Sequence, residues 1–296
     1  MFRICAAILP VYISLLPAAS PLPPTRARLA LYADAFLQRG INLTTQETLV
    51  QRTYRIPVHA RFAIGEAATP LTARFVTHEV VSQYGIGPLR GDSTGKLLEM
   101  RELLSMDGAA IQTPEKARRA LAGDIGAGET QIRKKMLETF TRLGLLDVAT
   151  DYGLILLAFT TRGQNSIEFE EAGEEWVGTD EADVLHWRQT FGGALEFRGR
   201  KTERRALHGA LWIRKSDGLP LRISASFEHD EAKHSLRDDA SVDFVLGRIG
   251  CVTPVSVVHR HLIDGVVLTE NLYTYQPFRL FTTDTTIRYG ESKEEK

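Results

Sequence analysis

The sequence predicts an α+β fold: a curved antiparallel sheet, an open half-barrel, with helices packed on its concave face. Two observations predict it. First, beyond residue 150 apolar and polar residues alternate in run after run, which is the pattern of strands with one buried face. Second, tight turns separate these runs, and helical segments gather near residues 25–39 and 113–143. Too few helices separate the strands for a parallel, doubly wound sheet.

The first twenty residues have the pattern of a secretory signal peptide. Arg3 precedes an apolar core at Ile4 to Leu16, and the small residues Ala18-Ala19-Ser20 follow, with cleavage expected after Ala18 or Ala19. An uncleaved N-terminal anchor is the alternative. We therefore expect a signal peptide at 1–20, one α+β domain at 21–290, a tail at 291–296, and a periplasmic or extracellular location. Without Cys5, Cys251 is the only cysteine, so no intramolecular disulfide is expected.

Three helices are expected. Leu29, Tyr32, Ala33, Phe36 and Leu37 share one helical face that ends at Gly40. Thr113-Pro114 is a helix start, with Thr as N-cap and Pro at the first helical position, and this helix is expected to reach Leu121. Residues Glu129 to Leu143 form the third, closed by Gly144.

Strands are expected along most of the remaining chain. The early segments are Leu49 to Ile64 and Arg74 to Gln83, then a Gly-rich loop at Gly85 to Gly95 in which Gly87-Pro88 excludes a central strand. Leu97 to Met106 fits a strand or a helix. The apolar run Leu154 to Phe159 is short enough to predict a buried strand.

The later strands are expected as hairpins. One joins 166–177 to 181–190, and another joins 192–200 to 205–214. Tight turns are expected at Ser216-Asp217-Gly218 and Asp264-Gly265, because Gly tolerates positive φ. Inward-facing residues are expected in two groups, and the segments Phe278 to Phe281 and Thr283 to Tyr289 should close the sheet. The inward residues are Leu221, Ile223, Ala225 and Phe227, and Ala240, Val242, Phe244 and Leu246. The segments 254–262 and 266–275 are expected to pair across Asp264-Gly265.

The charge balance excludes some partners. There are 36 basic and 37 acidic residues, so no nucleic acid or anionic membrane surface is indicated. No transmembrane span is expected after signal removal, and the oligomeric state is left open.

Two motifs suggest chemistry that their contexts disfavour. Gly91-Asp92-Ser93-Thr94-Gly95 matches G-x-S-x-G, but Gly87-Pro88 before it does not fit the buried strand that a nucleophile elbow requires, and a parallel sheet is also missing. A secreted serine hydrolase using Ser93 is kept as an alternative. His259 and His261 share one face of an expected strand, with Glu270 as a third candidate ligand, yet ordinary structural histidines are more common than a metal site there. We expect no catalytic residue, no metal and no cofactor.

Large aromatic residues are spread over successive strands. If the helices leave a gap above the sheet, these side chains line an apolar cavity, which predicts a ligand site of roughly 300 Å³ or more; if not, they form the core. The candidate cavity residues are Trp176, Trp187, Trp212, Phe227, Phe244 and Tyr273.

The organisation resembles the LolA/LolB-like superfamily of bacterial envelope proteins. More closely, the chain is similar to secreted uncharacterised proteins of Acidobacteria-type genomes. The likeness lies in turn and strand signatures: Ala149-Thr150-Asp151-Tyr152-Gly153, Gly209 to Ile213, Ser216 to Ile223, and Tyr273 to Thr285. The resemblance implies an open half-barrel that binds a lipid or a lipoprotein acyl chain without catalysis. A structural or scaffolding module that presents its sheet edge is a further alternative.

Overall fold

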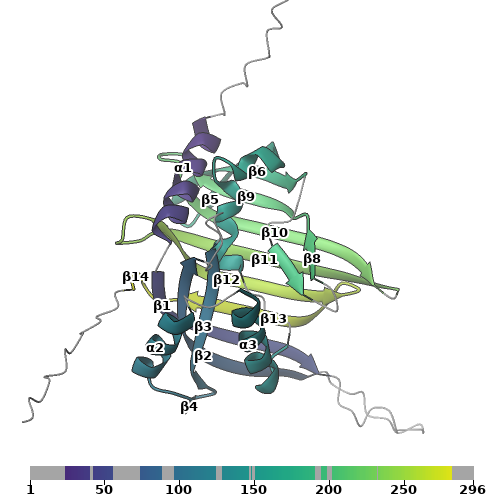
Figure 1. Ribbon diagram of the computed structural model, residues 1–296. Helices are drawn as coiled ribbons and strands as arrows, with labels where there is room; N and C mark the ends of the chain where they lie inside the picture. The colour runs from purple at the N-terminus through teal and green to yellow at the C-terminus, as the bar shows by residue number, and fades with distance from the viewer. Residues whose placement is uncertain are drawn as a thin grey trace, which may run out of the picture.

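Figure 1 shows a computed structural model in which one large curved sheet runs through the whole protein. The structure describes residues 24–40, 43–55, 74–88, 97–124, 129–146, 148, 151–190, 195–198, 202–231 and 233–281. The sheet has twelve strands, all paired antiparallel, and is not closed into a barrel. The predicted α+β fold class is therefore confirmed.

The main sheet has the order β4-β3-β2-β1-β13-β12-β11-β10-β9-β6-β5, and β14 pairs with β1. Most neighbours are consecutive hairpin strands, but β1 pairs with β13, so the two ends of the chain meet in the middle of the sheet. The strands are β1 (Leu43–Arg55), β2 (Arg74–Pro88), β3 (Leu97–Met106), β4 (Ala109–Ala110), β5 (Ile167–Val177), β6 (Asp180–Gln189), β9 (His208–Arg214), β10 (Pro220–Glu231), β11 (His234–Leu246), β12 (Val252–Ile263), β13 (Val266–Tyr275) and β14 (Arg279–Leu280).

Helices form where caps and apolar spacing predict them. They are α1 (Pro24–Arg39), α2 (Pro114–Asp124) and α3 (Glu129–Arg142), with 3-10 helices η2 (Tyr152–Phe159) and η3 (Gly163–Ser166). Thr113 caps α2, because its hydroxyl accepts a hydrogen bond from the Lys116 backbone N–H at 3.3 Å. Gly144 follows α3 with φ of 77°, a conformation that favours glycine.

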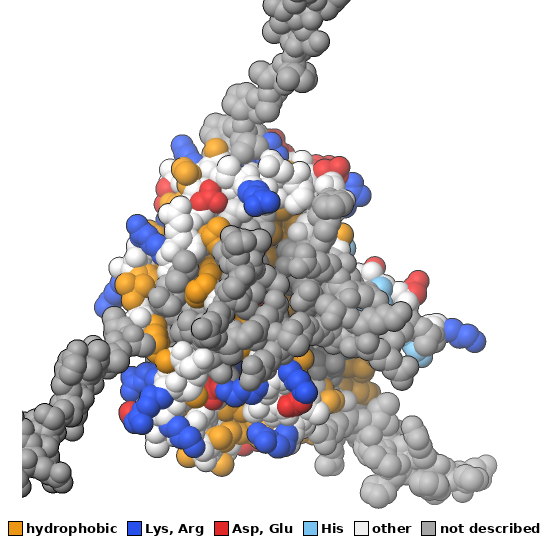
Figure 2. Space-filling view, in the orientation of Figure 1, with side chains coloured by type: hydrophobic (Ala, Val, Ile, Leu, Met, Phe, Trp, Pro, Cys, Tyr) orange, Lys and Arg blue, Asp and Glu red, His pale blue; other side chains and the backbone are white. Residues whose placement is uncertain are grey.

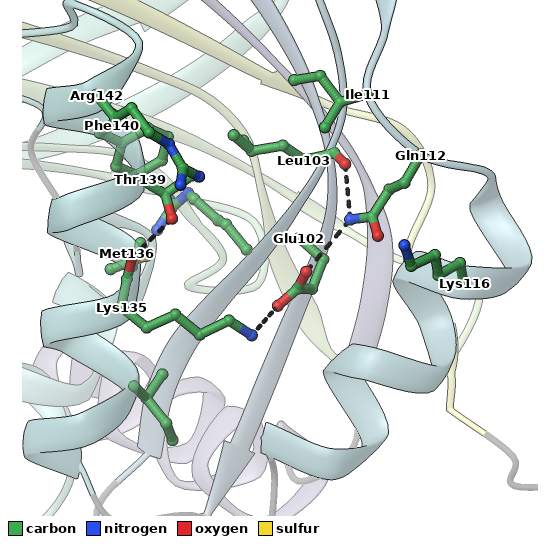
Figure 3. A pocket seen from close by; sticks show the side chains of 12 residues that line it. Glu102, Leu103, Ile111, Gln112, Lys116, Lys135, Met136, Thr139, Phe140 and Arg142 are labelled. Carbon is green, nitrogen blue, oxygen red and sulfur yellow. Dashed lines mark hydrogen bonds and ion pairs between the residues drawn. The ribbon is translucent and has the colours of Figure 1, made fainter.

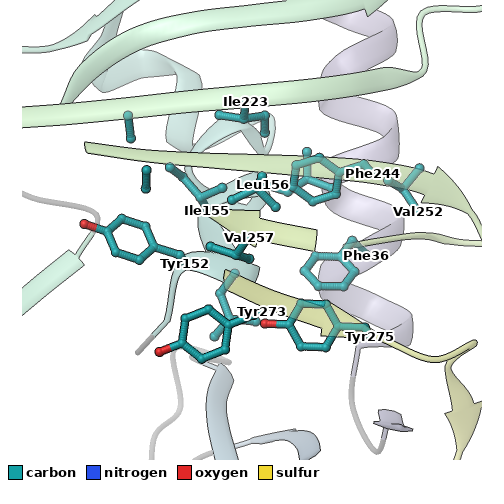
Figure 4. Close-up of a cluster of buried hydrophobic side chains, with 14 of the residues drawn as sticks. Phe36, Tyr152, Ile155, Leu156, Ile223, Phe244, Val252, Val257, Tyr273 and Tyr275 are labelled. Atoms are coloured by element: carbon teal, nitrogen blue, oxygen red, sulfur yellow. The ribbon is translucent and has the colours of Figure 1, made fainter. Parts of the chain in front are cut away.

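The buried core lies on the inner face of the sheet, where α1 and η2 pack (Figure 4). Along β10, Leu221, Ile223, Ala225 and Phe227 are buried as predicted. The run Leu154 to Phe159 is not a strand but lies in η2, and most of its side chains are buried against β3, β11, β12 and α1. The strand prediction there was wrong. It depended on the length of the apolar run, and a short run that is apolar throughout fits a buried helical segment as well as a buried strand.

The strand β2 extends into the first four residues of the predicted Gly-rich loop, so the prediction that Gly87-Pro88 excludes a central strand was wrong. Gly85, Ile86 and Gly87 pair with neighbours, and β2 ends at Pro88 between β1 and β3. Gly85 is required by packing: a Cβ there would lie 2.7 Å from Leu121 Cδ2 of α2. Successive residues of a strand face opposite sides of the sheet. Since Tyr84 points to the inner face, Gly85 and Leu121 of α2 meet on the outer face. α2 therefore covers the outer face of β2 and β3, whereas α1 and η2 cover the inner face.

Two further strand predictions need correction. The predicted hairpin of 192–200 with 205–214 is shorter in the described residues: β7 (Leu195–Arg198) pairs with β8 (Thr202–Arg205), so that Arg205 pairs with Leu195, whereas β9 joins the main sheet between β6 and β10. Leu246, expected to face inward, is 49% exposed, whereas Ala240, Val242 and Phe244 are buried. The turn at Asp264-Gly265 is confirmed, with φ of 50° and 78°.

Several predictions concern residues outside those described. These are the signal peptide at 1–20, the motif at Gly91 to Gly95 with Ser93, the segment Thr283 to Tyr289 and the tail at 291–296. Among the described residues, no helix is both long and apolar enough to cross a membrane.

Candidate functional site

A cavity of about 240 Å³ lies beside β3, between α2 and α3 (Figure 3). We call it the β3 pocket. Its walls come from β3, α2, α3 and the segment Ile111-Gln112 that joins β4 to α2. The lining residues are Arg101, Glu102, Leu103, Ile111, Gln112, Lys116, Ile132, Lys135, Met136, Thr139, Phe140 and Arg142.

One wall of the β3 pocket is apolar. Ile132, Met136 and Phe140 of α3 are buried, at spacings of four residues that place them on one helical face. Leu103 of β3 is also buried, whereas Ile111 is 48% exposed, although it is a large aliphatic residue. An exposed isoleucine beside buried apolar groups leaves apolar surface available to a ligand.

The acidic residue of the β3 pocket is already neutralised. Glu102 forms an ion pair with Lys135 and accepts a hydrogen bond from the Gln112 side chain at 3.2 Å. The same amide group donates to the Leu103 backbone carbonyl at 2.8 Å, which satisfies an acceptor at the edge of β3. These contacts tie α3, β3 and the start of α2 together.

Two cations of the β3 pocket are left without an acidic partner among the described residues. Arg142 lies at the end of α3, and Lys116 lies in the first turn of α2; both are exposed. Figure 3 shows them on opposite sides of β3. The pocket therefore combines an apolar wall with a positively charged opening.

On the inner face of β3 lies a second polar group, the Arg101 cluster of Glu47, Glu99 and Arg101. Arg101 Nε and Glu47 Oε1 are 2.7 Å apart, as are Arg101 Nη2 and Glu99 Oε2, and all three side chains are at most 2% exposed. The guanidinium also lies over the rings of Tyr84 and Tyr273 at 5.0 and 5.4 Å. Burial opposes its charge, yet the two carboxylates hold the pKa of Arg101 well above its usual range.

Part of the Arg101 cluster has no partner in the described structure. Glu99 Oε1, Arg101 Nη1 and the Tyr84 hydroxyl are buried without a hydrogen bond among the described atoms. Gly153 of η2 closes over two of them, since a Cβ at this position would lie 2.7 Å from Glu99 Oε1 and 3.2 Å from the Tyr84 hydroxyl. Burial, followed by the charge of Glu99, raises the pKa of Tyr84 well above its usual value, so the phenol stays neutral.

The two predicted histidines do lie together on the inner face. His259 Nε2 and His261 Nδ1 are 2.8 and 3.2 Å from the same oxygen of Asp238. Burial alone would raise the pKa of Asp238, but hydrogen bonds from both histidines lower it to about 2. Tyr152 stacks on His259 with ring centroids 5.3 Å apart.

Glu270 does not join these histidines. It pairs with Arg260, whose side chain lies on the opposite face of β12 from His259 and His261. The interpretation of Glu270 as a third ligand was therefore wrong. No group of three or more His, Cys, Asp or Glu residues suited to a metal occurs in the part of the chain that the structure describes.

The six predicted cavity residues lie in three environments. Trp187, Phe227, Phe244 and Tyr273 are buried in the inner core, where Phe159 of η2 contacts Trp187 edge-on at 5.1 Å. Trp176 on β5 is 70% exposed. Trp212 is partly buried, and its indole N–H donates to Glu175 at 2.7 Å. None of the six lines the β3 pocket, and their role in ligand binding stays a prediction.

Sequence reasoning did not find the β3 pocket. Most of its residues lie on Leu97 to Met106, which fitted a strand or a helix, and on two predicted helices. For these helices, only a position on the concave face of the sheet was predicted. One signal was present: basic residues are concentrated in α2 and α3, which carry seven basic and four acidic residues, while the whole chain has a net charge of −1. Figure 2 shows Lys and Arg side chains gathered over this region.

No protein-family model matches this chain, and no curated protein matches it. Three solved structures are similar in part. A domain named for outer membrane lipoprotein sorting from Vibrio parahaemolyticus is 9% identical, covering 86% of this chain and 92% of that chain, with a TM-score of 0.34. A LolA superfamily protein from Nitrosomonas europaea is 10% identical, covering 86% and 98%, with a TM-score of 0.28.

A DUF1329 family protein from Desulfovibrio piger is 10% identical, covering 88% of this chain and 94% of that chain, with a TM-score of 0.41. The neighbours thus include a member of the superfamily that the sequence resembles, while the closer similarity to proteins of Acidobacteria-type genomes stays a prediction. All three TM-scores are below 0.5, a likeness too small to carry an argument about function.

Proposed function

We propose that this chain is an exported, non-enzymatic envelope protein that binds an amphipathic ligand, such as an acyl chain of a lipid or lipoprotein, between its sheet and its helices. The observation that carries the proposal is the β3 pocket, whose lining includes exposed Ile111 and the buried side chains Ile132, Met136 and Phe140. The N-terminal signal pattern at 1–20 supports the exported location.

The volume of the β3 pocket limits the size of the ligand that it can bind. A cavity of about 240 Å³ is smaller than the roughly 300 Å³ expected from the sequence, which is where the range of small-molecule sites begins. It suits one alkyl chain rather than several. Burial contributes about 0.8 kcal/mol for each methylene, so affinity should rise with chain length until the pocket is filled.

The proposal is tested by filling the pocket. Thr139 lines it from α3, so Thr139→Trp places an indole in the space that the ligand needs. The matched control is Glu138→Trp, because Glu138 is the preceding residue, its side chain is 66% exposed and it does not line the pocket. We expect wild type and Glu138→Trp to bind the uncharged dye Nile red, and Thr139→Trp to lose at least about ten-fold in affinity.

Native mass spectrometry of the protein purified from a bacterial periplasm, with lipid extraction, supplies the second measurement. A bound phospholipid or fatty acid that is missing in Thr139→Trp supports the proposal. Equal dye binding by all three proteins, or no bound lipid and no dye binding in wild type, contradicts it. Circular dichroism of each variant checks that the fold is intact.

A further inference from the structure

The β3 pocket has a charge pattern that selects among amphipathic ligands. Its lining includes four basic residues, Arg101, Lys116, Lys135 and Arg142, and one acidic residue, Glu102. Arg101 is committed to Glu47 and Glu99, and Lys135 to Glu102. Lys116 and Arg142 therefore give the opening two positive charges that no acidic side chain in the described structure balances.

The apolar wall and these cations occupy different parts of the same pocket. Met136 and Phe140 lie on the face of α3 that packs against β3, and Arg142 follows two residues after Phe140, where the helix ends. On the other side of β3, Lys116 lies near Gln112 and Ile111 (Figure 3). An alkyl chain along the apolar wall thus ends beside a cation.

We propose that the ligand of the β3 pocket is an anionic, single-chain amphiphile whose carboxylate or phosphate head group is bound by Arg142, with its chain against Ile111, Ile132 and Met136. The proposal rests on the proposed function. A planar guanidinium binds carboxylate or phosphate through two parallel hydrogen bonds, so Arg142 is assigned the direct contact. Lys116, across β3, attracts the anion through its field.

The contribution of Arg142 and Lys116 to binding depends on how exposed their side chains are. Both cations are exposed, so each is screened by water and salt, and exposed charge pairs are worth little individually. We expect Arg142→Gln to weaken binding of dodecanoate about five-fold, Lys116→Gln about two-fold, and the double variant about ten-fold. Binding of dodecanol, which has the same chain and no charge, should not change in any of them.

The experiment measures displacement of Nile red from the full-length mature protein by dodecanoate, dodecyl phosphate, dodecanol and inorganic phosphate, each below its micelle concentration where it has one. Lys134→Gln is the matched control, because Lys134 lies on the same helix, its side chain is 72% exposed and it does not line the pocket. In wild type we expect both anionic amphiphiles to bind about ten-fold more tightly than dodecanol, with the difference reduced at high salt. Inorganic phosphate should not displace the dye.

Each other result has a defined meaning. If dodecanol binds as tightly as dodecanoate, or if the double variant keeps the preference, the assignment of an anionic head group fails while apolar ligand binding stands. Displacement by inorganic phosphate would assign the cations to a free anion and overturn the amphiphile. If Lys134→Gln loses the preference as fully as Arg142→Gln, the general basic surface is responsible and the pocket assignment fails. Absence of any dye or amphiphile binding removes the proposed function as well.

Discussion

Arg101 is a guanidinium buried among tyrosines, and its charge is balanced by two carboxylates at 2.7 Å. Removing one partner of such a group leaves a buried charge uncompensated, which is far more costly than the net value of the intact pair. The cluster fixes the inner face of β3 to β1, because Glu47 lies on β1. Arg101 lies on β3 and lines the β3 pocket, so its ion pair with Glu47 also holds this wall of the pocket in place.

Asp238 provides a pH-dependent prediction at the same scale. Its pKa is about 2 in the folded protein and about 3.9 in an unfolded chain. A lowered carboxyl pKa stabilises the folded state fully above about pH 4, and this contribution is lost as the pH falls toward 2. It amounts to about 2.6 kcal/mol. We expect Asp238→Asn to be less stable than wild type by about this amount at pH 5, and the difference to vanish near pH 2.

Urea unfolding at a series of pH values measures this difference. Asp230→Asn is the control, because Asp230 is an exposed carboxylate on β10. Its stability should follow the wild-type curve at every pH. A constant gap between Asp238→Asn and wild type from pH 5 to pH 2 would show that the ionised carboxylate is not the source of the stabilisation.

At the scale of elements, local signals predicted hairpins and helix ends well. The turn at Asp264-Gly265, the Thr113 cap and the Gly144 stop each depend on a few neighbouring residues, and all three are confirmed. The predictions failed where a distant segment decides the outcome. η2 is apolar on every side because strands and α1 surround it, and β2 continues through Gly85 because Leu121 packs there. The β3 pocket could not be predicted for the same reason, because its two walls meet only in the folded protein.

Gly153 tests how closely η2 packs on the sheet. A Cβ at this position would lie 2.7 Å from Glu99 Oε1, and Glu99 is held by Arg101, so it cannot move away freely. We expect Gly153→Ala to lower the free energy of unfolding by about 1–3 kcal/mol. Gly123→Ala in α2 should have the opposite sign, because no atom of the described residues lies within 4 Å of its Cβ position. It should stabilise the protein by about 0.5–1 kcal/mol.

Thermal or urea unfolding of both variants compares the two glycines directly. Equal effects of the two substitutions would mean that helix propensity alone determines the result, and that η2 does not press on the Glu99 side chain.

For the whole molecule, the position of β13 decides whether the strands form one continuous sheet. β13 lies between β1 and β12, and it pairs Glu47 with Tyr275 on one side and His259 with Asn271 on the other. Without it, β1, β2 and β3 lose their hydrogen-bonded connection to the β12–β5 half of the sheet. The local hairpins formed by consecutive strands therefore become one sheet only when both ends of the chain are present, which is a slow, non-local step in folding.

Truncation after Gly265 tests this dependence. The shortened chain lacks β13, so inner-face residues such as Leu49 and Val257, each 1% exposed in the intact protein, lose the strand between them. We expect the single cooperative unfolding transition of the full chain to be lost, because the two halves of the sheet are then joined by packing against η2 and no longer by a hydrogen-bonded strand. The control is Leu272→Ser, which keeps β13 and alters a side chain that is 38% exposed; its stability should change by less than about 1 kcal/mol. A truncated chain that unfolds in one transition with the full-length m-value would show that the halves are held together without β13.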